Sequence, residues 1–111
     1  MAAKANIIIE QGTDFSTTLT VEGDSGSATD LTGYTGAAQI RKHYTSNTAT
    51  NFTVTFGTPR TDGKLTLSLG RTVTANIADG RYVYDVELTN SANTRTRLVE
   101  GIVTVTPQVT R

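Results

Sequence analysis

Apolar and polar residues alternate along much of this sequence, and that period of two is the feature that most constrains its fold. The clearest segment is 82–89, in which every second side chain is large and apolar: Tyr82, Tyr84, Val86 and Leu88. Such a period places the apolar side chains on one face of a β-strand. Threonine, about a fifth of the residues, supports this because β-branched side chains fit a pleated sheet better than a helix. The chain is therefore predicted to be all-β.

The same pattern predicts the other strands and the turns between them. We expect strands at residues 7–9, 15–21, 38–41, 52–56, 65–69 and 95–106. Asp62-Gly63 predicts a two-residue type I′ hairpin turn, in which both central residues need a positive φ. Residues 71–78 lack the alternation, and Val73 and Ile77 lie four apart, which predicts one helical turn or an ordered loop.

About seven short strands separated by turn signals predict an immunoglobulin-like antiparallel β-sandwich. Tyr82 follows Asp79-Gly80 at the entry of a strand, so we expect it to be the tyrosine corner of such a fold. The 111 residues predict one domain, 1–111, in which residues 1–6 form a flexible N-terminal arm.

Composition excludes several classes of function. Ten basic and ten acidic side chains leave no net charge, so we expect neither a nucleic-acid partner nor a membrane-surface partner. The chain has no cysteine, which excludes disulfides, a thiolate zinc site and a cysteine nucleophile. The apolar run Ile7-Ile8-Ile9 is too short to span a membrane or to form the core of a signal peptide.

One string has a catalytic appearance. Gly23-Asp24-Ser25-Gly26 matches the peptide around the nucleophile of trypsin-like serine proteases, but it also describes a glycine-rich turn between two strands. The protease chemistry needs a histidine base, and the one histidine, His43, follows the serine instead of preceding it. The aspartates are scattered through turns without the spacing of a calcium loop. We therefore predict a protein that is not an enzyme, with no catalytic residues, no metal site and no cofactor.

The two terminal strands carry apolar residues on both faces. Ile7-Ile8-Ile9 has no polar member, and the last strand has Leu98 and Ile102 on one parity and valines on the other. Such a strand is covered on its second face either by a loop of its own chain or by another molecule. We predict a partner interface formed by Ile7, Ile8, Ile9, Val99, Val103 and Val105.

Two further groupings of side chains have alternative uses. Arg41, Lys42, Arg95 and Arg97 form either a basic patch or cross-strand ion pairs with Asp85, Glu87 and Glu100, and the sequence favours the ion pairs. The tyrosines 34, 44, 82 and 84 suggest a sugar-stacking platform. Tyr82 and Tyr84, however, share the parity of Val86 and Leu88 and are expected in the core.

Five segments of the chain resemble small virion proteins of tailed phages, including those of cyanobacteria. They are Ile9-Glu10-Gln11-Gly12-Thr13-Asp14-Phe15, Asp30-Leu31-Thr32-Gly33-Tyr34-Thr35, Ala38-Gln39-Ile40-Arg41, Gly80-Arg81-Tyr82-Val83-Tyr84-Asp85-Val86-Glu87 and Glu100-Gly101-Ile102-Val103-Thr104-Val105-Thr106-Pro107. The same segments are similar to the N-terminal immunoglobulin-like domain of phage baseplate upper proteins. That resemblance covers residues 7–111.

The resemblance implies a non-enzymatic structural protein of the virion, made in the host bacterial cytoplasm and assembled in multiple copies or as a homo-oligomer. Its expected partners are other virion proteins of the tail, baseplate or neck. Capsid decoration is the alternative within this class, and a carbohydrate- or cell-surface-binding module is the alternative from another class. Baseplate upper proteins continue into a receptor-binding part, whereas this chain stops at Arg111, so we expect docking and not direct host attachment.

Overall fold

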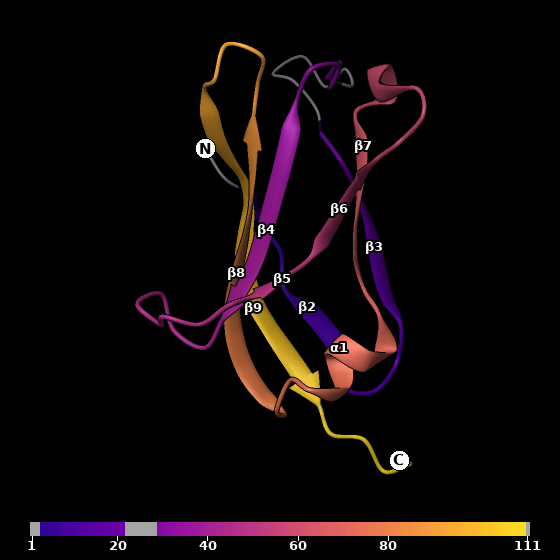
Figure 1. Cartoon of the computed structure of the whole chain (residues 1–111), viewed down its shortest axis with the longest axis vertical. Coiled ribbons are helices and arrows are strands. Elements are labelled where there is room, and N and C mark those ends of the chain that lie inside the picture. Colours follow the sequence, from indigo (N-terminus) through magenta and orange to yellow (C-terminus); the bar gives the residue numbers. More distant parts are fainter. Residues whose placement is uncertain (1–2, 22–28, 111) are drawn as a thin grey trace.

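Two β-sheets packed face to face make up the protein (Figure 1). The structure is a computed structural model that describes residues 3–21 and 29–110. Sheet A contains β1 (Ala3–Lys4), β2 (Ile7–Glu10), β4 (Thr35–Arg41), β5 (Thr50–Asn51), β8 (Gly80–Thr89) and β9 (Arg95–Thr106). Sheet B contains β3 (Phe15–Thr20), β6 (Thr53–Phe56) and β7 (Lys64–Leu69). Two short helical turns, η1 (Arg60–Asp62) and α1 (Arg71–Ala75), connect the strands.

The strand order is that of an immunoglobulin-like sandwich, as predicted. Sheet A runs β1-β9-β8-β4-β5, with β2 also paired to β9, and sheet B runs β3-β7-β6. All pairings are antiparallel except those of β1 and β2, which run parallel to β9. The last strand has the predicted bounds, and α1 is the predicted helical turn.

The core lies between the two sheets because each strand turns its alternate apolar residues inward. Leu65 and Leu67 of β7 and Val86 of β8 are fully buried. Phe52, between β5 and β6, marks the point where the chain passes from sheet A to sheet B, and its ring packs edge-on to Tyr84 with ring centroids 6.3 Å apart. Burial of these side chains supplies the main driving force for folding.

Tyr82 forms the predicted tyrosine corner. Its hydroxyl donates a hydrogen bond to the carbonyl of Ala78, four residues upstream at the entry of β8. The Lys42 ammonium lies 4.8 Å from the centroid of the same ring and donates to the carbonyl of Arg81. The corner therefore ties the start of β8 to the end of β4.

The prediction of a type I′ turn at Asp62-Gly63 is wrong. Only Gly63 has a positive φ, of 67°, while Asp62 belongs to the η1 turn. The physical reason lies in Arg60, whose guanidinium donates to the carbonyls of Leu31 and Tyr34 and stacks on the ring of Phe56. These contacts hold a longer connection between β6 and β7 than a two-residue turn allows.

The predicted flexible arm at residues 1–6 is also wrong for its described part. Ala3 and Lys4 pair with Val99 and Glu100 of β9, and the Ala5 amide donates to the carbonyl of Glu100. The Tyr84 hydroxyl donates to the carbonyl of Ala5 at 2.7 Å. A Cβ on residue 101 would lie 1.9 Å from that carbonyl oxygen, so only glycine permits this close approach.

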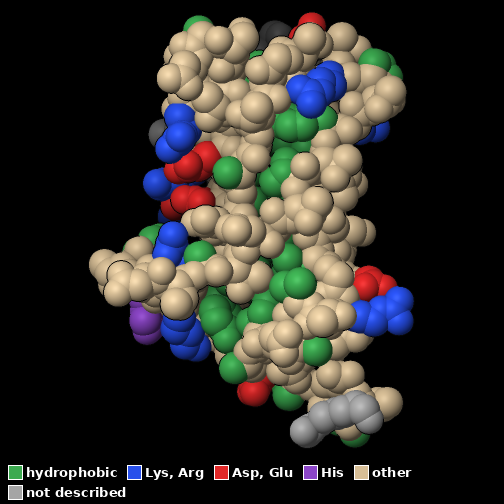
Figure 2. Space-filling view, viewed as in Figure 1, with side chains coloured by type: hydrophobic (Ala, Val, Ile, Leu, Met, Phe, Trp, Pro, Cys, Tyr) green, Lys and Arg blue, Asp and Glu red, His purple; other side chains and the backbone are tan. Residues whose placement is uncertain are grey.

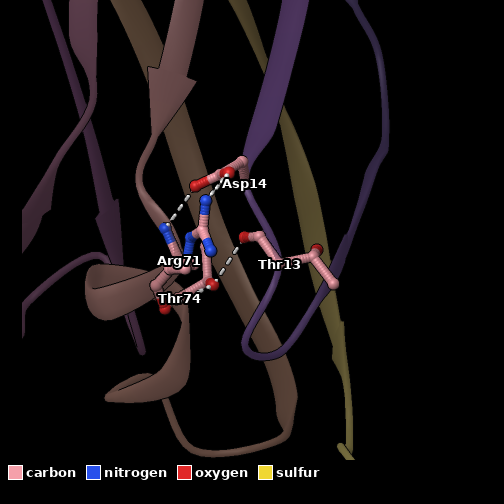
Figure 3. A network of polar contacts seen from close by, with 4 residues as sticks. All are labelled: Thr13, Asp14, Arg71 and Thr74. Carbon is pink, nitrogen blue, oxygen red and sulfur yellow. Dashed lines mark hydrogen bonds and ion pairs between the residues drawn. The ribbon is translucent and has the colours of Figure 1, made fainter.

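A network of polar contacts joins the β2–β3 turn to α1 (Figure 3). The hydroxyl of Thr74, which is fully buried, donates to the carbonyl of Thr13 and accepts from the amide of Gly12. The Asp14 carboxylate accepts from the Arg71 amide at 2.8 Å and pairs with the Arg71 guanidinium at 3.2 Å. Residues 12–14 therefore have a structural role, since each of them contacts α1.

We predict that Thr74→Val destabilises the protein by about 1–3 kcal/mol, because the amide of Gly12 and the carbonyl of Thr13 lose their buried partner. Thr72→Val, the same change at an exposed position of the same helix, should alter the free energy of unfolding by less than about 0.5 kcal/mol. Urea denaturation of both variants measures the difference. Equal losses would show that the network contributes nothing.

A second prediction concerns alkaline pH. Burial raises the pKa of the Tyr84 phenol above its ordinary value of about 10. Since the folded protein holds this proton more tightly than the unfolded chain, stability is retained below about pH 10 and falls as pH rises through the folded-state pKa. Phenolate absorbance of the wild type, compared with that of Tyr84→Phe, should assign to Tyr84 a transition at higher pH in the folded protein than in the unfolded chain. The same midpoint for Tyr84 in the folded and unfolded states would contradict the assignment.

Candidate functional site

The outer face of sheet A carries the most exposed apolar side chains of any strand in the described chain. Ile8 on β2 is 67% exposed and Ile102 on β9 is 43% exposed. Ile8 lies opposite Thr104 in the parallel register, which makes Ile102 its diagonal neighbour. Val83 of β8 lies opposite Ile102 and is half-buried. We call Ile8, Val83 and Ile102 the apolar patch.

A strip of charged residues continues the same face beyond the apolar patch. Arg97 lies 3.4 Å from the Asp85 carboxylate and 3.6 Å from that of Glu100, and Arg95 lies 4.0 Å from that of Glu87. Arg95 and Arg97 therefore form ion pairs, as the sequence favoured, whereas Arg41 and Lys42 donate to uncharged oxygens of Ser46, Gln39 and Arg81. Exposed pairs of this kind contribute about 0–1 kcal/mol each, so their main effect is to neutralise the strip.

Two shallow hollows lie above β4 and β8 on this face. One, of about 380 Å³, extends over Ala37, whose small side chain leaves space between its neighbours. The other, of about 250 Å³, includes Arg41 and the rim residue Tyr44, which is 77% exposed. Arg41 donates to Gln39, and Gln39 donates to Asn51 at 2.9 Å, so the floor between the hollows is held by side-chain hydrogen bonds.

The space-filling view shows where charged and hydrophobic side chains lie on one face of the molecule (Figure 2). Acidic and basic side chains gather along the left-hand flank, over sheet A. Hydrophobic side chains appear mainly along the seam between the two sheets. The charged strip is thus a surface feature of sheet A, separate from the core.

Most of the predicted partner interface lies in the core, which is a correction. Ile9 and Val103 are fully buried, and Val105 and Val99 are 2% and 7% exposed, so these four side chains cannot contact a partner while the fold is intact. Ile7 is half-buried and packs against the core. Of the six predicted residues, Ile8 alone is largely exposed.

A β-bulge explains part of this error. Val86 pairs with Val99 but Glu87 pairs with Arg97, so Leu98 is an extra residue in β9. Leu98 and Val99 therefore both pack toward the core although they are adjacent in sequence. The apparent second apolar face of β9 is reduced to Ile102. The sequence did contain a signal that Ile102 is exposed. It shares one face of the strand with Glu100 and Thr104, and both of these residues are polar.

The remaining candidate residues do not assemble into a reactive centre. In the described ranges, no group of three or more histidine, cysteine, aspartate or glutamate residues is placed to hold a metal ion. His43 is exposed in the loop after β4. Gly23-Asp24-Ser25-Gly26 lies outside the described residues. Of the four tyrosines, Tyr44 alone is exposed, because Tyr84 is buried and Tyr34 and Tyr82 pack against the core.

The helical segments of the described chain are short. None is long and apolar enough to cross a membrane.

Comparison with known proteins supports the fold. No protein-family model and no curated protein matches the sequence. Among solved structures, a variant of the SrpA adhesin from Streptococcus sanguinis is similar at 11% identity and a TM-score of 0.53, over 92% of this chain and 55% of that chain. An internalin-like protein of Listeria monocytogenes gives 13% identity and a TM-score of 0.51, over 95% of this chain and 28% of that chain.

The third similar structure is closer to this protein in length. CopC from Methylosinus trichosporium OB3b has 16% identity and a TM-score of 0.50, over 99% of this chain and 90% of that chain. This chain spans about half of the adhesin structure and about a quarter of the internalin-like one. At these identities the likeness shows a shared β-fold and nothing about shared function.

One matched pair of variants can test which residues of β9 face the core and which face the solvent. Val103→Thr should cost about 1–3 kcal/mol of stability, because it buries a hydroxyl in the centre of the core. Ile102→Thr should change stability by less than about 0.5 kcal/mol, because that side chain lies on the surface. Thermal and urea unfolding measure both values, and the reverse order would contradict the assigned faces.

Proposed function

We propose that this chain is a non-enzymatic structural protein of a tailed-phage particle, in its tail, baseplate or neck, and that the apolar patch docks on a neighbouring virion protein. The observation that carries the proposal is the exposure of Ile8 and Ile102, which are diagonal neighbours on adjacent strands of a sheet. Isolated surface isoleucines are ordinary, but a pair on a flat strand surface, continued by Val83, is suited to packing. The proposal that the particle is a tailed phage rests on the resemblance of five segments to small virion proteins.

The size of the patch supports a repeated assembly over a free-standing binder. Covering the exposed fractions of Ile8 and Ile102 contributes about 2–3 kcal/mol in total. Two free proteins need about 8 kcal/mol to associate at micromolar concentration. On a particle, neighbouring contacts raise the effective concentration to about the millimolar range, where a weak contact is sufficient.

Capsid decoration is the alternative location within the same class, and it would use the same patch. A carbohydrate- or cell-surface-binding module is the alternative from another class. One observation favours it: the exposed ring of Tyr44 stands at the rim of a hollow lined by polar side chains. Aromatic rings beside hydrogen-bonding groups suit sugar binding, although a single ring gives a small platform.

The docking role is tested by replacing both isoleucines. Particles of the phage that encodes this chain, made with Ile8→Asp together with Ile102→Asp, should lack the protein, because two buried carboxylates oppose the contact. The control is Thr53→Asp together with Thr55→Asp, at exposed positions of β6, which should leave the protein in the particles. Mass spectrometry of purified particles measures the stoichiometry. A folded double-isoleucine variant that still co-purifies would overturn this interface.

The two classes of function are separated by a second measurement. If the chain is structural, wild-type protein is stoichiometric in particles and the purified chain binds no glycan on an array. Glycan binding that Tyr44→Ala abolishes, with no protein in the particles, would favour the carbohydrate-binding alternative.

A further inference from the structure

The strand β3 forms one edge of sheet B. It pairs with β7 along Phe15 to Thr20, and no strand among residues 3–21 and 29–110 pairs with its other side. No hydrogen bond within the described chain reaches this outer edge of β3. An unpaired strand edge carries a row of backbone donors and acceptors that can bind another strand.

The register shows which backbone groups point outward. The amide of Val21 donates to the carbonyl of Gly63, one step beyond the pair formed by Thr20 and Lys64. Antiparallel strands bond at alternate residues, so the odd-numbered residues of β3 bond to β7. The backbone groups of Ser16, Thr18 and Thr20 therefore point away from sheet B.

This edge lacks the features that usually prevent strand pairing. Residues 15–20 contain no charge, no proline and no bulge, and all are apolar or hydroxyl-bearing residues. The other edges differ in length or charge. On sheet A, β5 and β1 each have two residues and β2 ends in Glu10, and on sheet B, β6 has four residues. Of the described edge strands, β3 is thus the longest and is uncharged.

The inner face of β3 is also incompletely covered. Phe15, Thr17 and Leu19 face the core but are only half-buried. Their partners on β7 are Leu69, Leu67 and Leu65, which are 4%, 0% and 0% exposed. The inward-facing side chains of β3 are thus more exposed than their partners on β7, because no further strand of the described chain lies beyond β3 to cover them.

We propose that β3 pairs antiparallel with β3 of a second copy of this chain, across a two-fold axis at Thr18. In this register Thr18 faces its own counterpart, and Ser16 faces Thr20 of the second copy. All three outward-pointing residues then exchange backbone hydrogen bonds, about six in total. Thr17 faces Leu19 of the second copy, so the half-buried inner side chains gain a neighbour.

A second copy fits this edge for reasons of charge and symmetry. The edge is neutral, so it selects no partner of opposite charge, and two such edges approach without repulsion. A two-fold contact requires a self-complementary surface. When the two edges pair, the hydroxyl-bearing side chains of one β3 lie beside the identical side chains of the other. The result is a sheet that continues from β6 of one copy to β6 of the other. This inference does not depend on the virion role or on the apolar patch.

The experiment uses the full chain at increasing concentration. Sedimentation should show a monomer–dimer equilibrium, and amide hydrogen exchange should locate it. In dilute solution the amides of Thr17 and Leu19 are protected and those of Ser16, Thr18 and Thr20 exchange fast. At dimer-forming concentration the exchange of these three amides should slow at least about tenfold.

Charge at the axis provides the decisive variants. Thr18→Lys places like charges opposite each other and should give a monomer, and Thr18→Glu should do the same. An equimolar mixture of the two should restore a heterodimer. Thr55→Lys, the same change at an exposed position of β6, should leave dimerisation intact. Thr18→Pro, which removes an outward-pointing amide without breaking the bonds to β7, should also give a folded monomer.

Three results would overturn the proposal. The first is a wild-type protein that stays monomeric at millimolar concentration. The second is a dimer that persists in Thr18→Pro while the amides of Ser16 and Thr20 still exchange fast. The third is a dimer lost only in the variant with Ile8→Asp and Ile102→Asp, which would place the contact between copies on the apolar patch.

Discussion

Pairing of β9 on both of its edges is the constraint on which the rest of this structure depends. One edge bonds to β8 along nearly its whole length, and the other bonds to β1 and β2. With both edges occupied, Val103 and Val105 lie in the middle of the core and not at its margin. The close approach at Gly101 and the hydrogen bond from Tyr84 to Ala5 serve this arrangement, because both hold the N-terminal segment against β9.

Local pattern was enough to predict the elements whose residues alternate. The strands around 65–69 and 82–88, the last strand and the helical turn after residue 70 all follow from the periodicity of their own side chains. The tyrosine corner followed from one residue at a strand entry. The parallel N-terminal pairing could not be found in this way. Ala3 and Lys4 have no pattern of their own, and the groups that position them come from β8 and β9.

The errors have the same origin. Asp62-Gly63 has the composition of a tight turn, but the contacts of Arg60 with distant carbonyls determine the connection. The bulge at Leu98 turns Leu98 and Val99 both toward the core, so a count of alternate residues gives β9 a second apolar face that the structure does not have. Of the residues predicted to contact a partner, Ile9, Val99, Val103 and Val105 are therefore buried, and Ile8 is largely exposed. A sequence shows which residues are apolar, but the face on which they lie depends on the register between strands.

The parallel pairing of β2 with β9 also determines how the domain responds to mechanical load. The described chain begins at β1, which also pairs parallel to β9, and leaves from the end of β9, so tension between the two ends slides β1 and β2 along β9. In that geometry the backbone hydrogen bonds between the strands are loaded together, in shear, instead of breaking one after another. A domain built in this way transmits a pulling force between whatever is attached at its two ends before it begins to unravel.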